Sequence, residues 1–453
     1  AHARAIQECY ASDSTEKVDV LKEDEISNED DKEQHIQIPN LKRLLSAIYS
    51  ISKVRGRKHI LKFLAHDACD VEPILHALRL MEEYPEETGL NIQCFNWESI
   101  YTLLVWIGML SLVPFDLNTI DSSSQIAMEK GSSGTIDGSS ALEKSPTLIS
   151  SMLMTTKKHL TDSGPTREAA ASSLSSLLSR PDLEDSELQD FVIFSSNVLK
   201  QYLDFQDSPG SKEKTMSIFL VMGIVQTLAA IFKTGSRSNL MERHLRCVEM
   251  LWEQAILVAD RAAPKKGLGG GAPLLRKLLA KLFARVGCSY LPPKVAEWRY
   301  QRGRRSLLEN LGSGGDSNVA SDHLNNVQMQ EGGKGCDMDH GHNTDLFRVP
   351  DQVEDSMAQL VHSLTDPATT VRWSAAKGIG RVTERLPAVC ADDVLDAIIE
   401  LTLDNENDNA WHGACLSLAE LARRGLLLPK RLGEVVPIVV RGIHYDVPRG
   451  QNS

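Results

Sequence analysis

Aromatic residues are scarce in this sequence: Phe, Trp and Tyr together make up only 5 % of its 453 residues. β-Sheets favour aromatic and β-branched side chains, and no convincing run of alternating apolar and polar residues is present, so an all-β fold is excluded. Leu, Ala and Ser dominate instead, and this balance favours packed helices. Apolar residues reach 42 %, which is enough to bury a core and excludes a wholly disordered chain.

Paired cysteines are also missing, because none of the eight cysteines forms a C-x-x-C motif. Several, such as Cys288 and Cys415, lie in an apolar helical pattern, which is typical of reduced, buried thiols in a cytosolic protein. The start of the chain is polar and then acidic, so it shows no secretory signal, and it lacks an initiator Met, as a fragment would. We therefore expect a cytoplasmic protein.

The chain has no excess of positive charge and no long apolar run. Its formal net charge of −12 makes it a poor general ligand for phosphate backbones, so no nucleic-acid partner is expected. The two most apolar stretches, residues 101–115 and 216–232, are shorter than the roughly 20 residues that span a bilayer. We interpret both as buried core helices and predict no membrane span.

Signatures of catalysis and of cofactor binding are absent as well. There is no G-x-S-x-G, H-E-x-x-H or Cys–His pattern. The glycine-rich run 265–271 lacks the G-K-[ST] ending of a phosphate loop and a preceding strand, which favours a flexible turn. Cys336, His340 and His342 lack the second ligand pair that a zinc site needs. We predict no catalytic site, cofactor or metal.

What the sequence does contain is a series of short helical blocks separated by polar segments. Segments rich in acidic residues, in Ser and Gly, or in Gly, Asn and Asp lack the apolar content that offsets chain entropy. We therefore predict an all-α, HEAT/armadillo-type helical-repeat solenoid with disordered linkers. The expected division is a mostly disordered acidic segment 1–38, helical repeats 39–120, a linker 121–145, helical repeats 146–311, a linker 312–346 and HEAT-like repeats 347–453.

One repeat is clearest near the C-terminal end, where D-P-A-T-T-V-R-W-S-A-A-K-G-I-G begins at Asp366. We predict that Asp366 caps a helix and that Pro367 lies in its first turn. Val371, Ala375, Ile379, Val382 and Leu386 then fall on one apolar face, and small residues such as Gly378 admit a neighbouring helix. A copy 38 residues later places Ala410, Ala414, Leu418 and Leu421 on a similar face, and a weaker copy begins at Asp162. A period near 40 residues is typical of HEAT and armadillo repeats.

Several blocks, in order, resemble the tubulin-folding cofactor D family. They are LVPFDL at 112–117, TREAA at 166–170, LPPKVAEWRYQRG at 291–303, VRWSAAKGIGR at 371–381, LPA and ADDV within 386–394, and DNAWHG with LAELARRGLLLP within 408–429. The two longest, around Trp298 and Trp373, are unusual enough to make the resemblance specific.

The resemblance implies a solenoid that binds β-tubulin. It further implies work with cofactors E and C and an ADP-ribosylation-factor-like small GTPase in assembling or taking apart the αβ-tubulin dimer. With cofactor C, such a protein stimulates GTP hydrolysis by tubulin, in the cytoplasm and in association with microtubules. Family members are longer, so the resemblance identifies this chain as an N-terminal portion that ends before the remaining repeats.

The first candidate interaction surface is the basic run after residue 292. It comprises Lys294, Trp298, Arg299, Arg302, Arg304 and Arg305, and it could face an acidic protein surface. The alternative is a solvated helix face with Trp298 buried between repeats.

The second candidate comprises Trp373, Lys377 and Arg381, which share the helix face opposite the Val371 stripe. An exposed Trp beside cations is a good protein contact, and the alternative is that Trp373 packs between repeats. Trp411 and His412 are ambiguous in the same way, and we expect Arg372 to pair with a capping Asp in a neighbouring turn.

Three hypotheses follow. The first is a tubulin-binding chaperone scaffold without catalysis of its own, and the second is a generic helical-repeat adaptor for another protein assembly. An enzyme is the third and has the least support. Binding to β-tubulin separates the first from the second.

Overall fold

In the computed structural model, every regular element in the described part of the chain is a helix, which confirms the all-α prediction. The structure describes residues 29–83, 96–122, 147–183, 185–207, 217–264, 272–293, 349–403, 407–427 and 429–443. Its main helices are α2 (Glu29–Arg55), α3 (Arg57–Ile60), α4 (Val71–Glu83), α5 (Asn96–Leu110), α6 (Leu117–Ile120), α8 (Leu148–Lys158), α9 (Pro165–Leu178), α10 (Glu187–Asp207), α11 (Ile218–Thr234), α12 (Leu245–Ala262), α13 (Pro273–Tyr290), α15 (Asp351–His362), α16 (Thr369–Thr383), α17 (Ala388–Glu400), α18 (Asp408–Arg423) and α19 (Leu432–Ile443). Short helical turns join several of them: η1 (Leu61–Phe63), η2 (Ala68–Asp70), η3 (His159–Thr161), η4 (Asn239–Arg243), η5 (Ser363–Thr365) and η6 (Pro429–Arg431).

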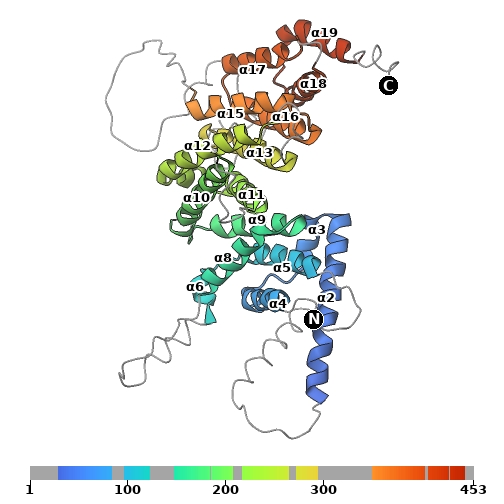
Figure 1. Cartoon of the computed structure of the whole chain (residues 1–453), viewed down its shortest axis with the longest axis vertical. Coiled ribbons are helices and arrows are strands. Elements are labelled where there is room, and N and C mark those ends of the chain that lie inside the picture. The colour runs from blue at the N-terminus through green and yellow to red at the C-terminus, as the bar shows by residue number, and fades with distance from the viewer. Residues whose placement is uncertain are drawn as a thin grey trace, which may run out of the picture.

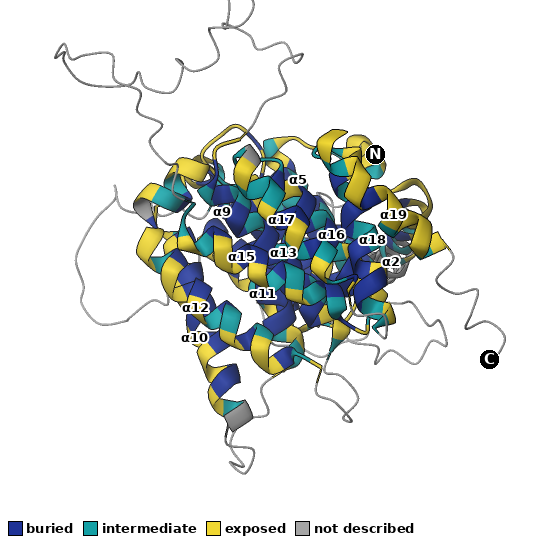
Figure 2. Cartoon of the chain, turned by 90° about the horizontal axis from the view of Figure 1, so that it is seen from above, coloured by how far each residue is buried: buried dark blue, intermediate teal, exposed yellow. Residues whose placement is uncertain are grey.

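The helices pack as successive pairs: α4 with α5, α8 with α9, α10 with α11, α12 with α13, α15 with α16, and α17 with α18. The second helix of each pair also packs on the second helix of the next pair, as α5 on α9 on α11 on α13 on α16 on α18. Figure 1 shows these pairs stacked in chain order along the long axis of the molecule. Seen from above, the buried residues concentrate on inner helices such as α11, α13 and α16 (Figure 2). The predicted helical-repeat solenoid is therefore confirmed.

Helix α16 forms for the reason that its sequence indicates. Val371, Ala375, Ile379 and Val382 are all buried, as the stripe predicted. Gly378 lies so close to the preceding repeat that an added Cβ would be 2.9 Å from the Cβ of Ala284 on α13. Only a residue without a side chain permits this contact, so the prediction that small residues admit a neighbouring helix is confirmed.

The predicted copy folds as the equivalent helix, α18, with its buried stripe 39 residues, and not 38, after that of α16. Ala410, Ala414, Leu418 and Leu421 are buried along it. At Gly413 an added Cβ would lie 2.2 Å from the carbonyl oxygen of Leu364, in the turn η5. Each of these two inner helices thus meets the preceding repeat through a glycine.

The start of α16 differs from the prediction. The helix begins at Thr369, so Pro367 precedes it and does not lie in its first turn. Asp366 is not the N-cap residue, which is Ala368, although the Asp366 carboxylate accepts a 2.8 Å hydrogen bond from the Ala368 amide. The same carboxylate also pairs with Arg276 of the preceding repeat.

Two predicted boundaries also shift. Helix α2 begins at Glu29, inside the segment 1–38 that was expected to be mostly disordered. Asp121 was placed in a linker, yet it is buried and its carboxylate accepts a 3.0 Å hydrogen bond from the amide of Leu148 at the start of α8. Residues 123–146 and 294–348, which hold the rest of the first predicted linker and all of the second, lie outside the described residues, as does the glycine-rich run 265–271.

Arginines close the C-terminal ends of helices in neighbouring repeats. After α9, Arg180 donates to the carbonyls of Ser111, Val113 and Phe115, which follow α5, at 2.7, 2.9 and 2.7 Å. After α16, Arg385 donates to the carbonyl of Cys288 near the end of α13. The last carbonyls of a helix have no partner within it, so these guanidinium groups satisfy acceptors that would otherwise be stranded.

Candidate protein-interaction surface

The surface of α16 carries the second predicted candidate group. Trp373 is 53 % exposed, so the alternative that it packs between repeats is wrong. The Nζ of Lys377, one helical turn later, lies 3.7 Å from the centroid of the Trp373 ring, in a cation–π contact. Arg381 follows after another turn and is exposed. The structure thus brings Trp373, Lys377 and Arg381 together on one exposed face.

Basic side chains of two earlier inner helices extend this face. Lys277, Lys281 and Arg285 recur every four residues along α13, which packs directly on α16, and Lys233 is exposed at the end of α11. We call the set the basic strip: Lys233, Lys277, Lys281, Arg285, Trp373, Lys377 and Arg381. It crosses three successive repeats of a chain whose net charge is −12.

The charges of the strip act on one another. Burial lowers the pKa of Lys281, and the charges of Lys277, Arg285 and Arg381 lower it further, against an opposing effect of Glu168. Burial also lowers the pKa of Lys233, with contributions from Arg285, Arg381 and the α3 residues Lys58 and Arg57. Positive groups from several repeats therefore share one region, where they repel one another.

Arg372 lies beneath this surface and is structural, but its partners differ from the prediction. Its Nη1 donates to the backbone carbonyl of Asp366 and to Oδ1 of Asn409, both at 2.6 Å. Its Nε donates to Nδ1 of His412 at 3.1 Å. The expected pairing with a capping carboxylate in a neighbouring turn is wrong, because the Asp366 carboxylate is engaged by Arg276. Arg372 instead joins the start of α16 to the start of α18.

His412 and Trp411 differ in their exposure to solvent. His412 is exposed, and burial of part of its ring, together with the Arg372 charge, lowers its pKa, which keeps Nδ1 free to accept the hydrogen bond. Trp411 is only 3 % exposed, and the guanidinium of Arg441 on α19 lies 4.5 Å from its ring centroid. As a surface contact, the candidate Trp411 is wrong, because α19 covers it.

The first predicted candidate group lies outside the described residues. It comprises Lys294, Trp298, Arg299, Arg302, Arg304 and Arg305, and the described chain stops at Pro293, three residues after α13. Their assignment to an interface stays a prediction.

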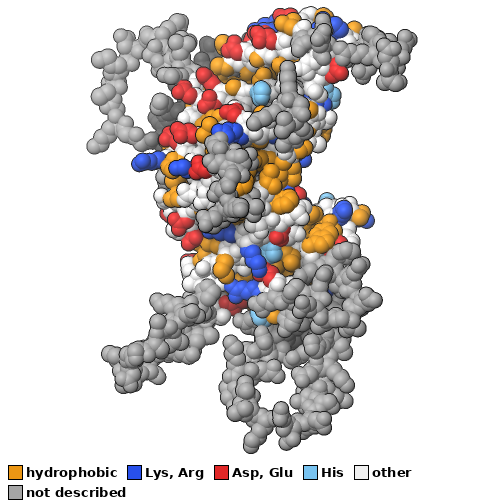
Figure 3. Space-filling model, in the orientation of Figure 1, with side chains coloured by type: hydrophobic (Ala, Val, Ile, Leu, Met, Phe, Trp, Pro, Cys, Tyr) orange, Lys and Arg blue, Asp and Glu red, His pale blue; other side chains and the backbone are white. Residues whose placement is uncertain are grey.

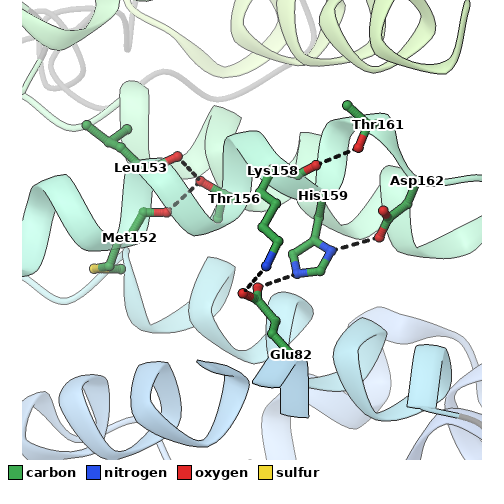
Figure 4. Close-up of polar contacts among 8 residues, drawn as sticks. All are labelled: Glu82, Met152, Leu153, Thr156, Lys158, His159, Thr161 and Asp162. Atoms are coloured by element: carbon green, nitrogen blue, oxygen red, sulfur yellow. Dashed lines mark hydrogen bonds and ion pairs between the residues drawn. The ribbon is translucent and has the colours of Figure 1, made fainter. Parts of the chain in front are cut away.

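Sequence reasoning missed a buried charged cluster between the first repeats, shown in Figure 4. The Nε2 of His159 is 2.6 Å from Oε1 of Glu82, and its Nδ1 is 2.7 Å from Oδ2 of Asp162. Lys158 also reaches Glu82, at 2.6 Å. Burial lowers the pKa of His159, but the hydrogen bonds to Asp162 and Glu82 outweigh it and raise the pKa to about 9. Both ring nitrogens are used, so this cluster fastens α4 to η3.

Cys288 and Cys415 are half-buried free thiols in the described part of the chain. Burial raises the pKa of the Cys288 and Cys415 thiols, which keeps them protonated near neutral pH. Among the residues that the structure describes, no three His, Cys, Asp or Glu side chains gather in a way that could hold a metal ion. No helix of the described ranges is long and apolar enough to cross a membrane.

Two family models match the chain. One, described as tubulin-specific chaperone D-like armadillo repeats, matches residues 17–199, and a second model of the same description matches residues 274–453. The first match extends into α10, and the second begins in α13 and includes α15 to α19. The basic strip lies mostly in the second matched range.

Two curated proteins are similar over most of this chain. A protein named tubulin-specific chaperone D from Dictyostelium discoideum is 29 % identical over 470 residues, covering 91 % of this chain and 30 % of that protein. A protein named tubulin-folding cofactor D from Schizosaccharomyces pombe is 25 % identical over 426 residues, covering 89 % of this chain and 30 % of that protein. The chain thus spans about 30 % of the length of these relatives. With its stacked helix pairs and two matching family models, the chain belongs to the tubulin-specific chaperone D-like family of armadillo-repeat proteins.

Proposed function

We propose that this chain is a non-catalytic scaffold that binds β-tubulin through the basic strip. Family membership and the names of the two relatives support a tubulin chaperone role. The observation that carries the proposal is the strip itself, where an exposed Trp and six Lys or Arg side chains from three repeats gather on an acidic chain. An aromatic anchor among cations is the composition expected where a protein partner docks.

The mechanism is a grip spread over several repeats. An acidic partner surface neutralises the strip, and the Trp373 ring supplies an apolar anchor at one end. The chain then holds β-tubulin while cofactors E and C and an ADP-ribosylation-factor-like GTPase act on the complex. In this proposal the assembly builds or takes apart the αβ-tubulin dimer and promotes GTP hydrolysis by tubulin, in the cytoplasm and at microtubules.

The direct test is binding of the 453-residue chain to purified tubulin, with β-tubulin detected in the captured material. Trp373→Ala and the double variant Lys377→Glu/Arg381→Glu are compared with Lys200→Glu, which reverses an exposed charge on α10. We expect both strip variants to weaken binding at least ~10-fold and the control to bind like the parent chain. Equal binding by all four proteins excludes the strip, and capture of other proteins without tubulin favours the adaptor hypothesis.

The basic run after α13 needs its own variant. Reversing Arg302, Arg304 and Arg305 to Glu together should weaken tubulin binding without changing the unfolding temperature. Unchanged affinity would remove that run from the proposal and leave the strip on α11, α13 and α16 as the contact.

A further inference from the structure

Helix α2 carries two apolar stripes, and only one of them is needed for the fold. Leu45 and Tyr49 are buried against α5. The Tyr49 ring packs edge-on against Trp97 and Tyr101, with centroids 4.9 and 5.0 Å apart. This stripe attaches α2 to the first inner helix.

The second stripe faces an open groove. The groove has a volume of about 650 Å³ and is lined by Leu44, Ile48, Ile51, Arg55, His59, Ile60, Phe63 and Leu64. Its walls are α2 on one side and α3 with η1 on the other. Phe63 is 84 % exposed and Ile51 is 51 % exposed, so large apolar side chains are exposed to solvent in this groove. Figure 3 shows hydrophobic side chains with Lys or Arg beside them over this corner of the molecule.

The charge around the groove has one sign. Residues 41–66, which form both walls, contain seven Lys or Arg and no Asp or Glu: Lys42, Arg43, Lys53, Arg55, Arg57, Lys58 and Lys62. Glu168 of α9 lies beside Arg57 and Lys58, but in a separate depression on the other side of α3. In a chain of net charge −12, this is a local reversal of sign next to exposed apolar surface.

We propose that this groove binds an acidic amphipathic helix of a partner protein. The apolar face of such a helix covers Ile51 and Phe63, and its flanking carboxylates meet Arg55, His59 and the nearby lysines. A protein helix suits the site better than a membrane surface, because the apolar side chains line a trough between two walls, whereas an interfacial helix presents a convex apolar face to lipid. The site lies in the first repeats, away from Trp373, and none of the residues that line it belongs to the basic strip.

The experiment is a selection from a library of displayed short helical peptides with randomised surface positions, using the 453-residue chain as bait. The peptides retained should combine Leu or Ile at helical spacing on one face with Asp or Glu at its edges. A labelled peptide from this pool should bind the double variants Ile51→Asp/Phe63→Asp and Arg55→Glu/Lys62→Glu at least ~10-fold more weakly than the parent chain. Val389→Asp is the matched control, since Val389 is 74 % exposed on α17, and it should bind like the parent.

Three results overturn the proposal. Retained peptides could be basic or could lack an apolar face, or they could bind the groove variants and the parent equally well. The chain could instead bind phosphatidylserine-containing vesicles, and not pure phosphatidylcholine vesicles, through Arg55 and Lys62 while no acidic helix is retained, which assigns the groove to lipid. Thermal unfolding of each variant shows that the α2–α5 contact persists.

Discussion

The guanidinium of Arg276 and the carboxylate of Asp366 face each other across the junction between two repeats. Nε of Arg276 lies 2.6 Å from Oδ2, and Nη2 lies 3.2 Å from Oδ1, in a two-point contact between side chains that are 8 % and 5 % exposed. Arg276 is in the first turn of α13, and Asp366 is in the turn before α16. The pair therefore fixes how one inner helix is placed against the next.

Removing one partner of this pair should be costly. Asp366→Ala leaves the buried Arg276 charge uncompensated, and we expect it to lower the free energy of unfolding by about 3–5 kcal/mol, measured by urea denaturation. Arg423→Ala is the control, because its ion pair with Glu420 is surface-exposed on the arginine side and should contribute less than about 1 kcal/mol. Similar losses in the two variants would mean that Arg276 is resolvated when Asp366 is removed.

The His159 cluster should make stability fall at alkaline pH. The folded pKa of about 9 exceeds the ordinary 6.5, so the contribution of His159 is fully present below pH 6.5 and is lost as the pH rises through about 9. We expect the free energy of unfolding to lose about 2–3 kcal/mol over this window, and His159→Gln to remove that part of the loss. Urea denaturation at several pH values measures it. Parallel curves for the variant and the parent would show that His159 is neutral in the folded chain.

Close helix packing and backbone strain can be separated with three Gly→Ala variants. Gly413→Ala puts a Cβ against the Leu364 carbonyl and should cost about 2–4 kcal/mol. Gly425→Ala has open space but a φ of +68°, so only about 1 kcal/mol of strain is expected. Gly433→Ala, in α19 with nothing within 4 Å, should stabilise by about 0.5–1 kcal/mol. A different order of the three unfolding free energies would contradict the packing at Gly413.

Repulsion among the charges of the basic strip should lower the stability of the fold, while the same charges favour tubulin binding. Lys281→Met keeps most of the side-chain volume and removes one of several mutually repelling charges. Because solvent screens part of that repulsion, we expect a rise in unfolding free energy of only a few tenths of a kcal/mol, with weaker tubulin binding. Lys200→Met on α10 should change neither quantity. A destabilised Lys281→Met that binds normally would show that the charge serves the fold alone.

The repeat architecture could be predicted from sequence because the apolar spacing of each helix is local. The stripe through Val371 and Ala375 identifies both the helix and its buried face, and Gly378 indicates the close neighbour. The same logic failed at the helix start. Whether Asp366 caps its own helix or pairs with Arg276, 90 residues earlier, depends on a contact between repeats that no local pattern contains.

The candidate site was only partly predictable for the same reason. A shift of 38 residues pairs Trp373 with Trp411, but the buried stripes of α16 and α18 differ by 39 residues. Trp411 therefore corresponds to the buried Arg372 and lies under α19 and Arg441. The α13 lysines join the strip only through the packing of α13 on α16. The seven basic residues between positions 41 and 66, with no acidic residue among them, indicate a positively charged surface from sequence alone. The groove beside them could not be predicted, because it forms only where the chain turns back after α2.

The arginines at the helix ends couple each repeat to another. Arg180 completes the end of α5 from beyond α9, Arg385 completes α13 from beyond α16, and Arg441 donates to the Thr402 carbonyl after α17 at 3.0 Å. Because each of these donors follows in the chain the carbonyl that it serves, loss of a later repeat strips hydrogen-bond donors from an earlier one, so unfolding that begins at the last repeats spreads towards the first ones.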